Sequence, residues 1–192
     1  MTGRSSPEVK LFKDQKAWEA WLRKHDAASG GVWLRLAKKT AALKFITYPE
    51  ALEVALCHGW IDGQTLSHDA ESWLQKFTPR RPQSIWSKIN RDRALALIKN
   101  KKMRPAGLAA IEQAKANGRW EAAYDSHRTA EPPPDFLKVL NKNAKAKTFF
   151  ATLTASNRYA VLFRIQTAKK PETRLKRIAR FVEMLERRET FH

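Results

Sequence analysis

Hydrophobic and polar positions in the first half of the chain alternate in a way that predicts a small sheet. A short strand is expected over Val9–Phe12. Val32–Lys38 has a period of two, which is typical of a strand with one buried face. Trp60–Leu66 and Ser72–Thr78 are two further strands, and the short polar connection 67–71 between them predicts a hairpin. The sheet is therefore expected to be mainly antiparallel.

Segments with helical periodicity lie between these strands and after them. Asp14 is a suitable cap for a helix whose apolar residues recur every three or four positions. Thr47 and Glu50 have the Thr-x-x-Glu spacing of a capping box and predict a second helix. Two more helices are expected: one capped by Ser84 or Ser87 that reaches about Lys99, and one over about 105–117. Together with the strands, they predict an α+β fold with helices packed on the sheet.

A proline-rich hinge divides the chain. Three consecutive prolines in Glu131–Asp135 favour an extended connector. The sequence predicts an α+β body over residues 1–130, with a basic helix start near 79–93, and a helical, basic C-terminal part over 131–192. In that part we expect helices near 136–140, 144–153 and 155–168. A last helix should bury one apolar face, formed by Leu175, Ile178, Val182 and Leu185.

Charge changes this picture because it is unevenly distributed. The 37 Lys and Arg residues outnumber the 19 Asp and Glu residues, so the formal net charge is +18. Residues 1–78 carry 11 basic and 9 acidic side chains, residues 79–128 carry 12 and 4, and residues 129–192 carry 14 and 6. Such an asymmetry favours a face that binds phosphate or another anion.

Several kinds of chemistry are not indicated. The single cysteine, Cys57, excludes an internal disulfide, and the five histidines lack metal-ligand spacing, so we expect neither a metal nor a cofactor. Glycine-rich phosphate loops and nucleophile elbows are absent from the sequence. The first residues contain no apolar run, and no stretch is apolar for long enough to span a bilayer. Cytoplasmic residence is the expectation.

Short motifs distributed along the chain resemble one protein family. In sequence order they are Trp33–Lys39, Tyr48–Leu52, Ala55–Gln64, Phe77–Asn90, Met103–Gly107, Gly118–Trp120 and Ala168–Arg174. Through them, nearly the whole chain resembles the YdeI/OmpD-associated family, also called bacteriocin-protection proteins. The resemblance implies a link to tolerance of bacteriocins or antimicrobial peptides and to a porin. It brings no catalytic residues to this sequence.

The segment from residue 79 to 93 is the strongest candidate for an anion site. Helix N-termini present free N–H groups and a positive dipole end, and arginine adds bidentate contacts to phosphate or carboxylate. The alternative is a solvated loop before an ordinary capped helix. The expected anion-binding residues of this segment are Arg80, Arg81, Ser84, Ser87, Lys88 and Arg91.

Two further residues of the segment would complete a pocket. Trp86 offers a flat face on which a base or sugar can stack. Asn90 shares a helix face with Trp86 and should point inward. The simpler interpretation of Asn90 is that its amide binds a loop carbonyl.

An acidic residue on a predicted strand offers a catalytic alternative. Trp60, Asp62 and Gln64 should share one face of that strand. Beside a large indole, Asp62 would have a raised pKa and act as a general acid or base. The structural alternative, which we favour, is an ion pair that positions Arg80 or Arg81.

A second basic helix start lies near the C-terminus. Lys169 and Lys170 precede Pro171, and Arg174 and Arg177 follow it. With Arg180 they would form a cationic stripe for an anion. The alternative is a solvated helix face, the usual role of such stripes.

Three functions remain open. The first is a basic anion-binding protein that contacts nucleic acid or a phosphorylated small molecule, and the sequence favours it. The second is a peripheral envelope-stress protein that binds an anionic membrane surface or an acidic protein partner. The third is an enzyme for a small anionic substrate, with Asp62 as acid/base and Arg80, Arg81 and Lys88 as the clamp. The absence of catalytic motifs makes the enzyme the least favoured.

Overall fold

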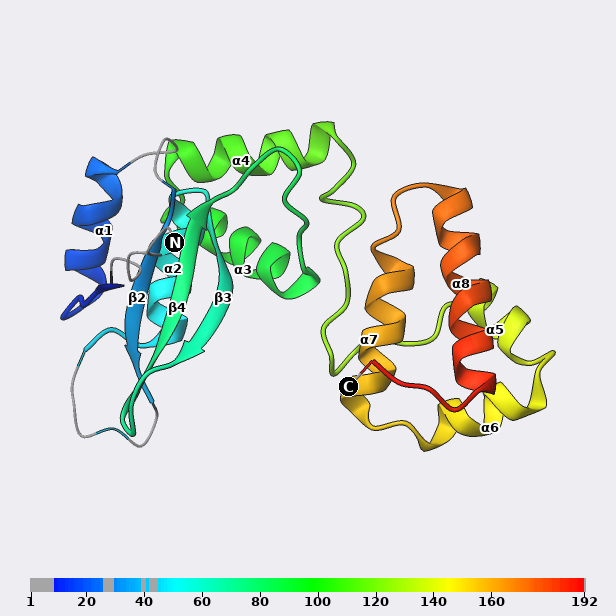
Figure 1. Cartoon of the computed structure of the whole chain (residues 1–192). Coiled ribbons are helices and arrows are strands. Elements are labelled where there is room, and N and C mark those ends of the chain that lie inside the picture. Colours follow the sequence, from blue (N-terminus) through cyan, green and yellow to red (C-terminus); the bar gives the residue numbers. More distant parts are fainter. Residues whose placement is uncertain (1–8, 26–29, 39–40, 42–44, 192) are drawn as a thin grey trace, which may run out of the picture. The chain divides into compact units, whose positions relative to one another are not determined.

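The computed structural model describes residues 9–25, 30–38, 41 and 45–191. Within these residues the chain forms four strands and eight helices, which confirms the predicted α+β class (Figure 1). The chain divides into two compact units. The first comprises Met1–Ile85 and Asn90–Glu121, and the second comprises Trp86–Ile89 and Ala122–His192. Among the described residues, no helix is long and apolar enough to cross a membrane.

The first unit contains a four-stranded sheet with the order β1-β2-β4-β3 (Figure 1). Its strands are β1 (Val9–Lys10), β2 (Val32–Ala37), β3 (Trp60–Ser67) and β4 (Ser72–Pro79). β1 pairs with β2 in parallel, and the other two pairings are antiparallel. The predicted hairpin and the mainly antiparallel sheet are confirmed.

Asp69 holds the turn of the β3–β4 hairpin. Its Oδ1 accepts hydrogen bonds from the backbone N–H of Glu71 at 2.9 Å, and from the N–H and Oγ of Ser72 at 2.6 and 2.7 Å. Its Oδ2 accepts a hydrogen bond from Arg35 Nη2 at 2.7 Å. The Ser72 hydroxyl, the two backbone N–H groups and the Arg35 charge lower the pKa of Asp69 to about 2. The Asp69 carboxylate is therefore charged at neutral pH while it holds the hairpin turn.

Two helices of the first unit begin where the sequence predicts. α1 (Gln15–Lys24) is capped by Asp14, whose carboxylate accepts from the Ala17 N–H. α2 (Tyr48–Cys57) begins with the capping box of Thr47 and Glu50. The core between helices and sheet is aromatic: Trp18 is fully buried against Trp60 and Phe77.

Two later helices follow the sheet. α3 (Lys88–Lys99) starts directly after Ser87, the later of the two expected caps, whereas Ser84 lies in the preceding turn. α4 (Pro105–Ala116) begins at a proline and ends at Asn117, and Gly118 then has a positive φ of 72°. Gly107 of α4 is buried against the last turn of α2, where an added Cβ would lie 2.4 Å from the carbonyl oxygen of Cys57.

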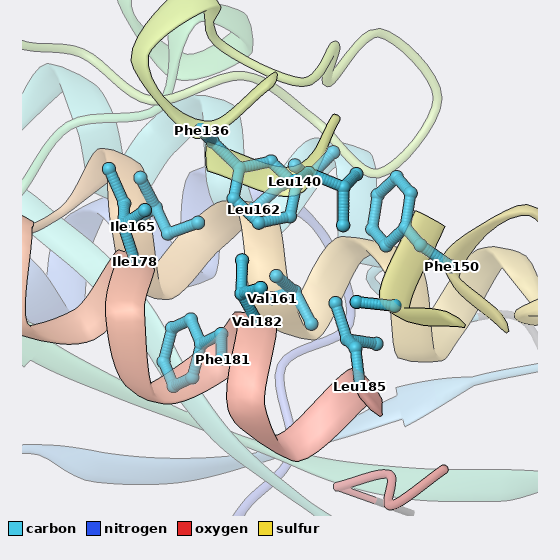
Figure 2. Packing of buried hydrophobic residues seen from close by; sticks show 11 residues of the cluster. Phe136, Leu140, Phe150, Val161, Leu162, Ile165, Ile178, Phe181, Val182 and Leu185 are labelled. Atoms are coloured by element: carbon cyan, nitrogen blue, oxygen red, sulfur yellow. The ribbon is translucent and has the colours of Figure 1, made fainter. Parts of the chain in front are cut away.

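The second unit is helical around one apolar core. It contains α5 (Pro134–Leu140), α6 (Ala144–Thr152), α7 (Ala155–Gln166) and α8 (Pro171–Glu186). The third proline of the predicted hinge opens α5, because proline suits the first turn of a helix. Figure 2 shows side chains from all four helices meeting in the core, which comprises Phe136, Leu140, Ala146, Phe150, Val161, Leu162, Ile165, Ile178, Phe181, Val182 and Leu185.

One residue of the predicted α8 face is placed differently. Leu175 is 63% exposed, whereas Phe181, which the prediction left out, is buried. Leu175 precedes the part of α8 that packs into the core, so the helical period overestimates the length of the buried stripe.

Candidate functional site

The first unit contains a cavity of about 710 Å³. Four segments meet there: the last turn of α1, the junction of α2 and β3, the end of β4 and the first turns of α4. Cavities of a few hundred to a thousand cubic ångströms are typical of small-molecule sites. The lining residues are Leu22, Arg23, His58, Gly59, Trp60, Pro79, Arg80, Arg104, Pro105, Ala106, Ala109, Ala110 and Gln113.

The polar side of this cavity is basic. Arg23, Arg80 and Arg104 line it together with His58, and among the described residues no carboxylate belongs to the lining. Burial of the His58 imidazole is the largest influence on its pKa and lowers it below the ordinary value of 6.5, against the opposing effect of Glu19. At neutral pH the three guanidinium groups therefore supply the positive charge, and His58 adds a neutral ring that accepts or donates a hydrogen bond.

Each basic residue is placed by the end of an element. Arg23 is in the last turn of α1, where a cation interacts favourably with the helix dipole. Arg104 is the N-cap of α4, and its N–H donates to the carbonyl of Cys57 at 3.1 Å. The N–H of Arg80 donates to the Gly59 carbonyl at 2.9 Å and continues the β3–β4 pairing by one residue.

The rest of the cavity lining is mostly apolar. Trp60 is 2% exposed and packs edge-on against Trp18, so its position is fixed by the core. On α4, Ala106, Ala109 and Ala110 repeat at helical spacing and occupy little volume. A ligand with an anionic group and an apolar body would match both parts of the lining.

Glu19 of α1 binds two of the cavity's arginines. Its Oε1 accepts hydrogen bonds from Arg104 Nη2 at 2.6 Å and Nε at 3.0 Å, and from Arg23 Nη2 at 3.0 Å. The same atom lies 3.7 Å from His58 Nε2. Burial alone would raise the pKa of Glu19, but its hydrogen bonds and charge interactions with both arginines outweigh burial and hold the pKa below 4.5. Glu19 is therefore ionised at neutral pH.

The cavity includes two of the residues predicted from the sequence, Arg80 and Trp60. Arg81 and Ser84 are close by but form a turn: the N–H of Arg81 donates to Ser84 Oγ at 2.9 Å, and the N–H of Ser84 donates to the Arg81 carbonyl at 2.8 Å. Arg81 is exposed. Of the predicted arginine pair, one thus lines a cavity and the other faces solvent.

Asp62 has a structural contact. Its Oδ2 accepts a hydrogen bond from the Tyr48 hydroxyl at 2.8 Å. A register shift lies between Asp62 and Thr65 on β3, and this bulge interrupts the alternation that was expected to place Gln64 on the face of Trp60. Gln64 is exposed. Neither Asp62 nor Gln64 is among the residues that line the cavity.

The residues around the start of α3 pack into the second unit. Trp86 is 3% exposed, so its ring is a core side chain and not the open stacking face that was expected. The N–H of Lys88 donates to the Tyr124 carbonyl at 2.9 Å, and Lys88 Nζ lies 2.7 Å from Asp125 Oδ1. Ser87 forms a bridge with Tyr124. This pairing of backbones holds residues 86–88 against the second unit.

The two remaining residues of that segment are half-buried on α3. Arg91 Nη1 donates to the Trp120 carbonyl at 3.4 Å, a contact within the first unit. Asn90 is half-buried, but α3 begins at Lys88, so Asn90 does not share a helix face with Trp86 as expected.

The second basic segment contains two arginines that connect helices. Arg174 forms a bidentate pair with Asp135, with Nε–Oδ2 at 2.5 Å and Nη2–Oδ1 at 2.8 Å. Arg177 Nη1 donates to the Arg164 carbonyl at 2.5 Å. Lys169 and Lys170 are exposed. The stripe is therefore divided between interhelical contacts and solvent.

Sequence reasoning missed the other basic residues of the cavity. Arg23, His58 and Arg104 lie far apart in the chain, and each has the appearance of an ordinary helix-end residue. The one available signal was Arg104-Pro105, a basic residue directly before a helix start, which is the pattern that drew attention to Arg80. Among the described residues, no cluster of three or more His, Cys, Asp or Glu side chains could hold a metal ion.

Two protein-family models match separate parts of the chain, and the gap between them includes the boundary between the two compact units. The model of a domain of unknown function (DUF8412) matches residues 10–110, which include every cavity residue except Gln113. The model described as Bacteriocin-protection, YdeI or OmpD-Associated matches residues 129–188. Neither the curated proteins nor the solved structures that were searched contain a match.

The family resemblance seen in the sequence is thereby confirmed, and its match is located in the C-terminal part. Of the motifs that carried it, Ala168–Arg174 lies inside this match, and most of the others lie in the region of the first model. The chain belongs to the DUF8412 family through its first half and carries a bacteriocin-protection, YdeI or OmpD-associated domain in its C-terminal part.

Proposed function

We propose that this protein binds a small anionic ligand, a phosphorylated molecule, in the cavity of its first unit. The observation that carries the proposal is the lining: three arginines and His58 face a space whose described lining residues include no carboxylate. The positive charges of the three arginines are therefore not balanced by a carboxylate within the described lining. Guanidinium groups suit phosphate oxygens because each presents several N–H donors in a fixed plane.

The size of the cavity favours a small molecule over a polymer for this site. The apolar part of its lining contains Trp60, Leu22 and the alanines of α4, which would cover an uncharged body attached to the anionic group. The C-terminal domain associates the chain with bacteriocin protection. We propose that ligand binding by the first unit serves that role in the cytoplasm.

Nucleic acid is a second candidate ligand, for the second unit. The exposed residues Lys138, Lys142, Lys145 and Lys147 lie on or next to α5 and α6, and residues 129–192 carry eight more basic than acidic side chains. Exposed lysines contact phosphates without reading sequence. Fluorescence anisotropy with labelled DNA and RNA at several salt concentrations measures this: log K should fall linearly with log salt, and no binding at low salt would eliminate the candidate.

The cavity is tested by calorimetric titration with phenyl phosphate, combined with ¹⁵N–¹H spectra of the same samples. We expect saturable binding, with the largest amide shifts at His58–Trp60 and at Arg104–Ala106, whose segments form the cavity. Arg80→Gln should weaken binding by about tenfold or more, since a hydrogen bond to a charged group contributes roughly 1.5–3 kcal/mol. Arg81→Gln is the matched control and should bind like the wild type.

A second pair of variants guards against misfolding, because Arg80 also donates to the Ile85 carbonyl at 3.2 Å. Ala109→Glu places a negative charge on the exposed part of the cavity lining, whereas Ala116→Glu adds the same charge to α4 outside the lining. The first should abolish binding and the second should preserve it. Equal effects of the two, or shifts confined to other segments, would refute a ligand site in this cavity.

A further inference from the structure

We propose that Glu19 is an internal counter-ion of the cavity, which the ligand's anionic group replaces at the arginines, so that Glu19 raises the negative charge that a ligand needs to bind and a phosphate monoester meets that requirement. This inference rests on the proposed function and adds the class of ligand and the residue that sets the charge requirement. It concerns a residue outside the cavity lining, one turn before Leu22 and Arg23 on α1.

The contacts of Glu19 resemble those that a bound anion would make. A single oxygen, Oε1, accepts two hydrogen bonds from Arg104 and one from Arg23, and it is also the atom of Glu19 that lies closest to His58. Three of the four basic groups that line the cavity therefore converge on one carboxylate oxygen. Its side chain is 26% exposed, so the carboxylate is close enough to solvent to move away.

The arginines keep donors for a ligand. A guanidinium group has five N–H donors, and among the described residues the hydrogen bonds to Glu19 use Nε and Nη2 of Arg104 and Nη2 of Arg23. In the described part of the chain, no hydrogen bond to Glu19 uses the Nη1 group of either arginine, and both residues line the cavity. A ligand can therefore approach the same guanidinium groups from the cavity and compete with Glu19 for their charge.

Charge decides which ligand wins. A carboxylate or sulfonate brings one negative charge, which merely equals the charge of Glu19, and the two anions repel each other across the arginines. A phosphate monoester carries about −1.5 to −2 near neutral pH, so its attraction to three guanidinium groups exceeds that of Glu19. Glu19 thus raises the charge that a ligand needs, and it disfavours the singly charged metabolites that would otherwise enter.

Phenyl phosphate and benzenesulfonate form a matched pair of probes, with the same ring, a tetrahedral head group and different charge. For the wild-type protein we expect phenyl phosphate to bind at least about tenfold more tightly by calorimetric titration, because its larger negative charge is attracted more strongly to the three guanidinium groups. Glu19→Gln should tighten the binding of both probes by about tenfold, because either anion has to replace the same carboxylate. Glu53→Gln is the control, because Glu53 pairs with Lys102 at 2.8 Å and does not line the cavity.

The outcomes separate this inference from the proposed function. If Glu19→Gln leaves both affinities unchanged or weakens both, while Arg104→Gln still abolishes phenyl phosphate binding, Glu19 merely positions the arginines and the inference is wrong. If no variant binds either probe, the proposed function fails as well. Glu19→Asp keeps the charge on a shorter arm and should bind both probes with affinities near those of the wild type. Behaviour like that of Glu19→Gln would show that packing, not charge, is the effect of Glu19.

Discussion

Gly107 provides a direct test of how the cavity is built. It is the third residue of α4 and is buried against the C-terminus of α2. In Gly107→Ala, the new Cβ would lie 2.4 Å from the Cys57 carbonyl oxygen and 2.9 Å from the Cys57 carbonyl carbon. Met103 Sδ is also 2.4 Å away, but that side chain can rotate. The backbone of Cys57 cannot move independently, so the two helices must separate.

The cost follows from this displacement. Cβ contacts under 3.0 Å are essentially never observed, so the gap must widen by at least 0.6 Å, the difference between 3.0 and 2.4 Å. Overpacking of this kind costs about 3 kcal/mol when backbone lies on both sides. The better helix propensity of alanine returns about 1 kcal/mol. We expect a net loss of about 2 kcal/mol, which lowers the melting temperature of a unit of this size by roughly 8 °C.

Tryptophan fluorescence is a suitable assay because six of the seven tryptophans belong to the first unit and only Trp86 belongs to the second. Gly30→Ala is the control: an added Cβ there meets nothing within 4 Å. Gly107→Ala should also weaken phenyl phosphate binding, because the Arg104 N–H is held by the same Cys57 carbonyl. A melting temperature within about 2 °C of the wild type would refute the close packing of α2 and α4.

Two further predictions concern titratable groups. Burial raises the pKa of the Cys57 thiol from 9.0 to about 11, so at pH 8 the native protein should contain about a hundredfold less thiolate than an ordinary cysteine would. Native Cys57 should therefore react with Ellman's reagent much more slowly than the denatured protein does. Rapid labelling of the native protein would contradict this. The hydrogen bonds from Arg174 hold the pKa of Asp135 below 3.8. The stability that this pair adds to the second unit is therefore present above about pH 4, and it is lost as the pH falls through the lowered pKa. Circular dichroism melts of wild type and Arg174→Gln should therefore differ most above pH 4 and converge in strong acid; a constant difference would exclude the ion pair as the cause.

Local signals in the sequence determined most of the secondary structure. Asp14, the Thr47–Glu50 capping box and Pro105 each act within one turn of a helix, and each placed a helix start correctly. The hairpin of β3 and β4 was equally readable, because its strands are neighbours in sequence and its turn is short. The family was also recognisable from short motifs.

Neighbouring elements decided what the local pattern could not. Trp86 reads as an exposed aromatic residue before a helix, yet backbone pairing with Tyr124 buries it in the second unit. Arg174 reads as part of a cationic stripe, yet Asp135 on another helix binds it. In both positions, a partner more than thirty residues away in sequence determines the role of the side chain.

The candidate site shows the same division. Arg80 and Trp60 were accessible from the sequence because both stand at the boundary of a predictable element. Arg23, Arg104 and Glu19 were not, because their charges become one cluster only when α1 and α4 both pack against α2. Sequence order constrains which residues begin and end each element, whereas packing alone determines which of those ends meet.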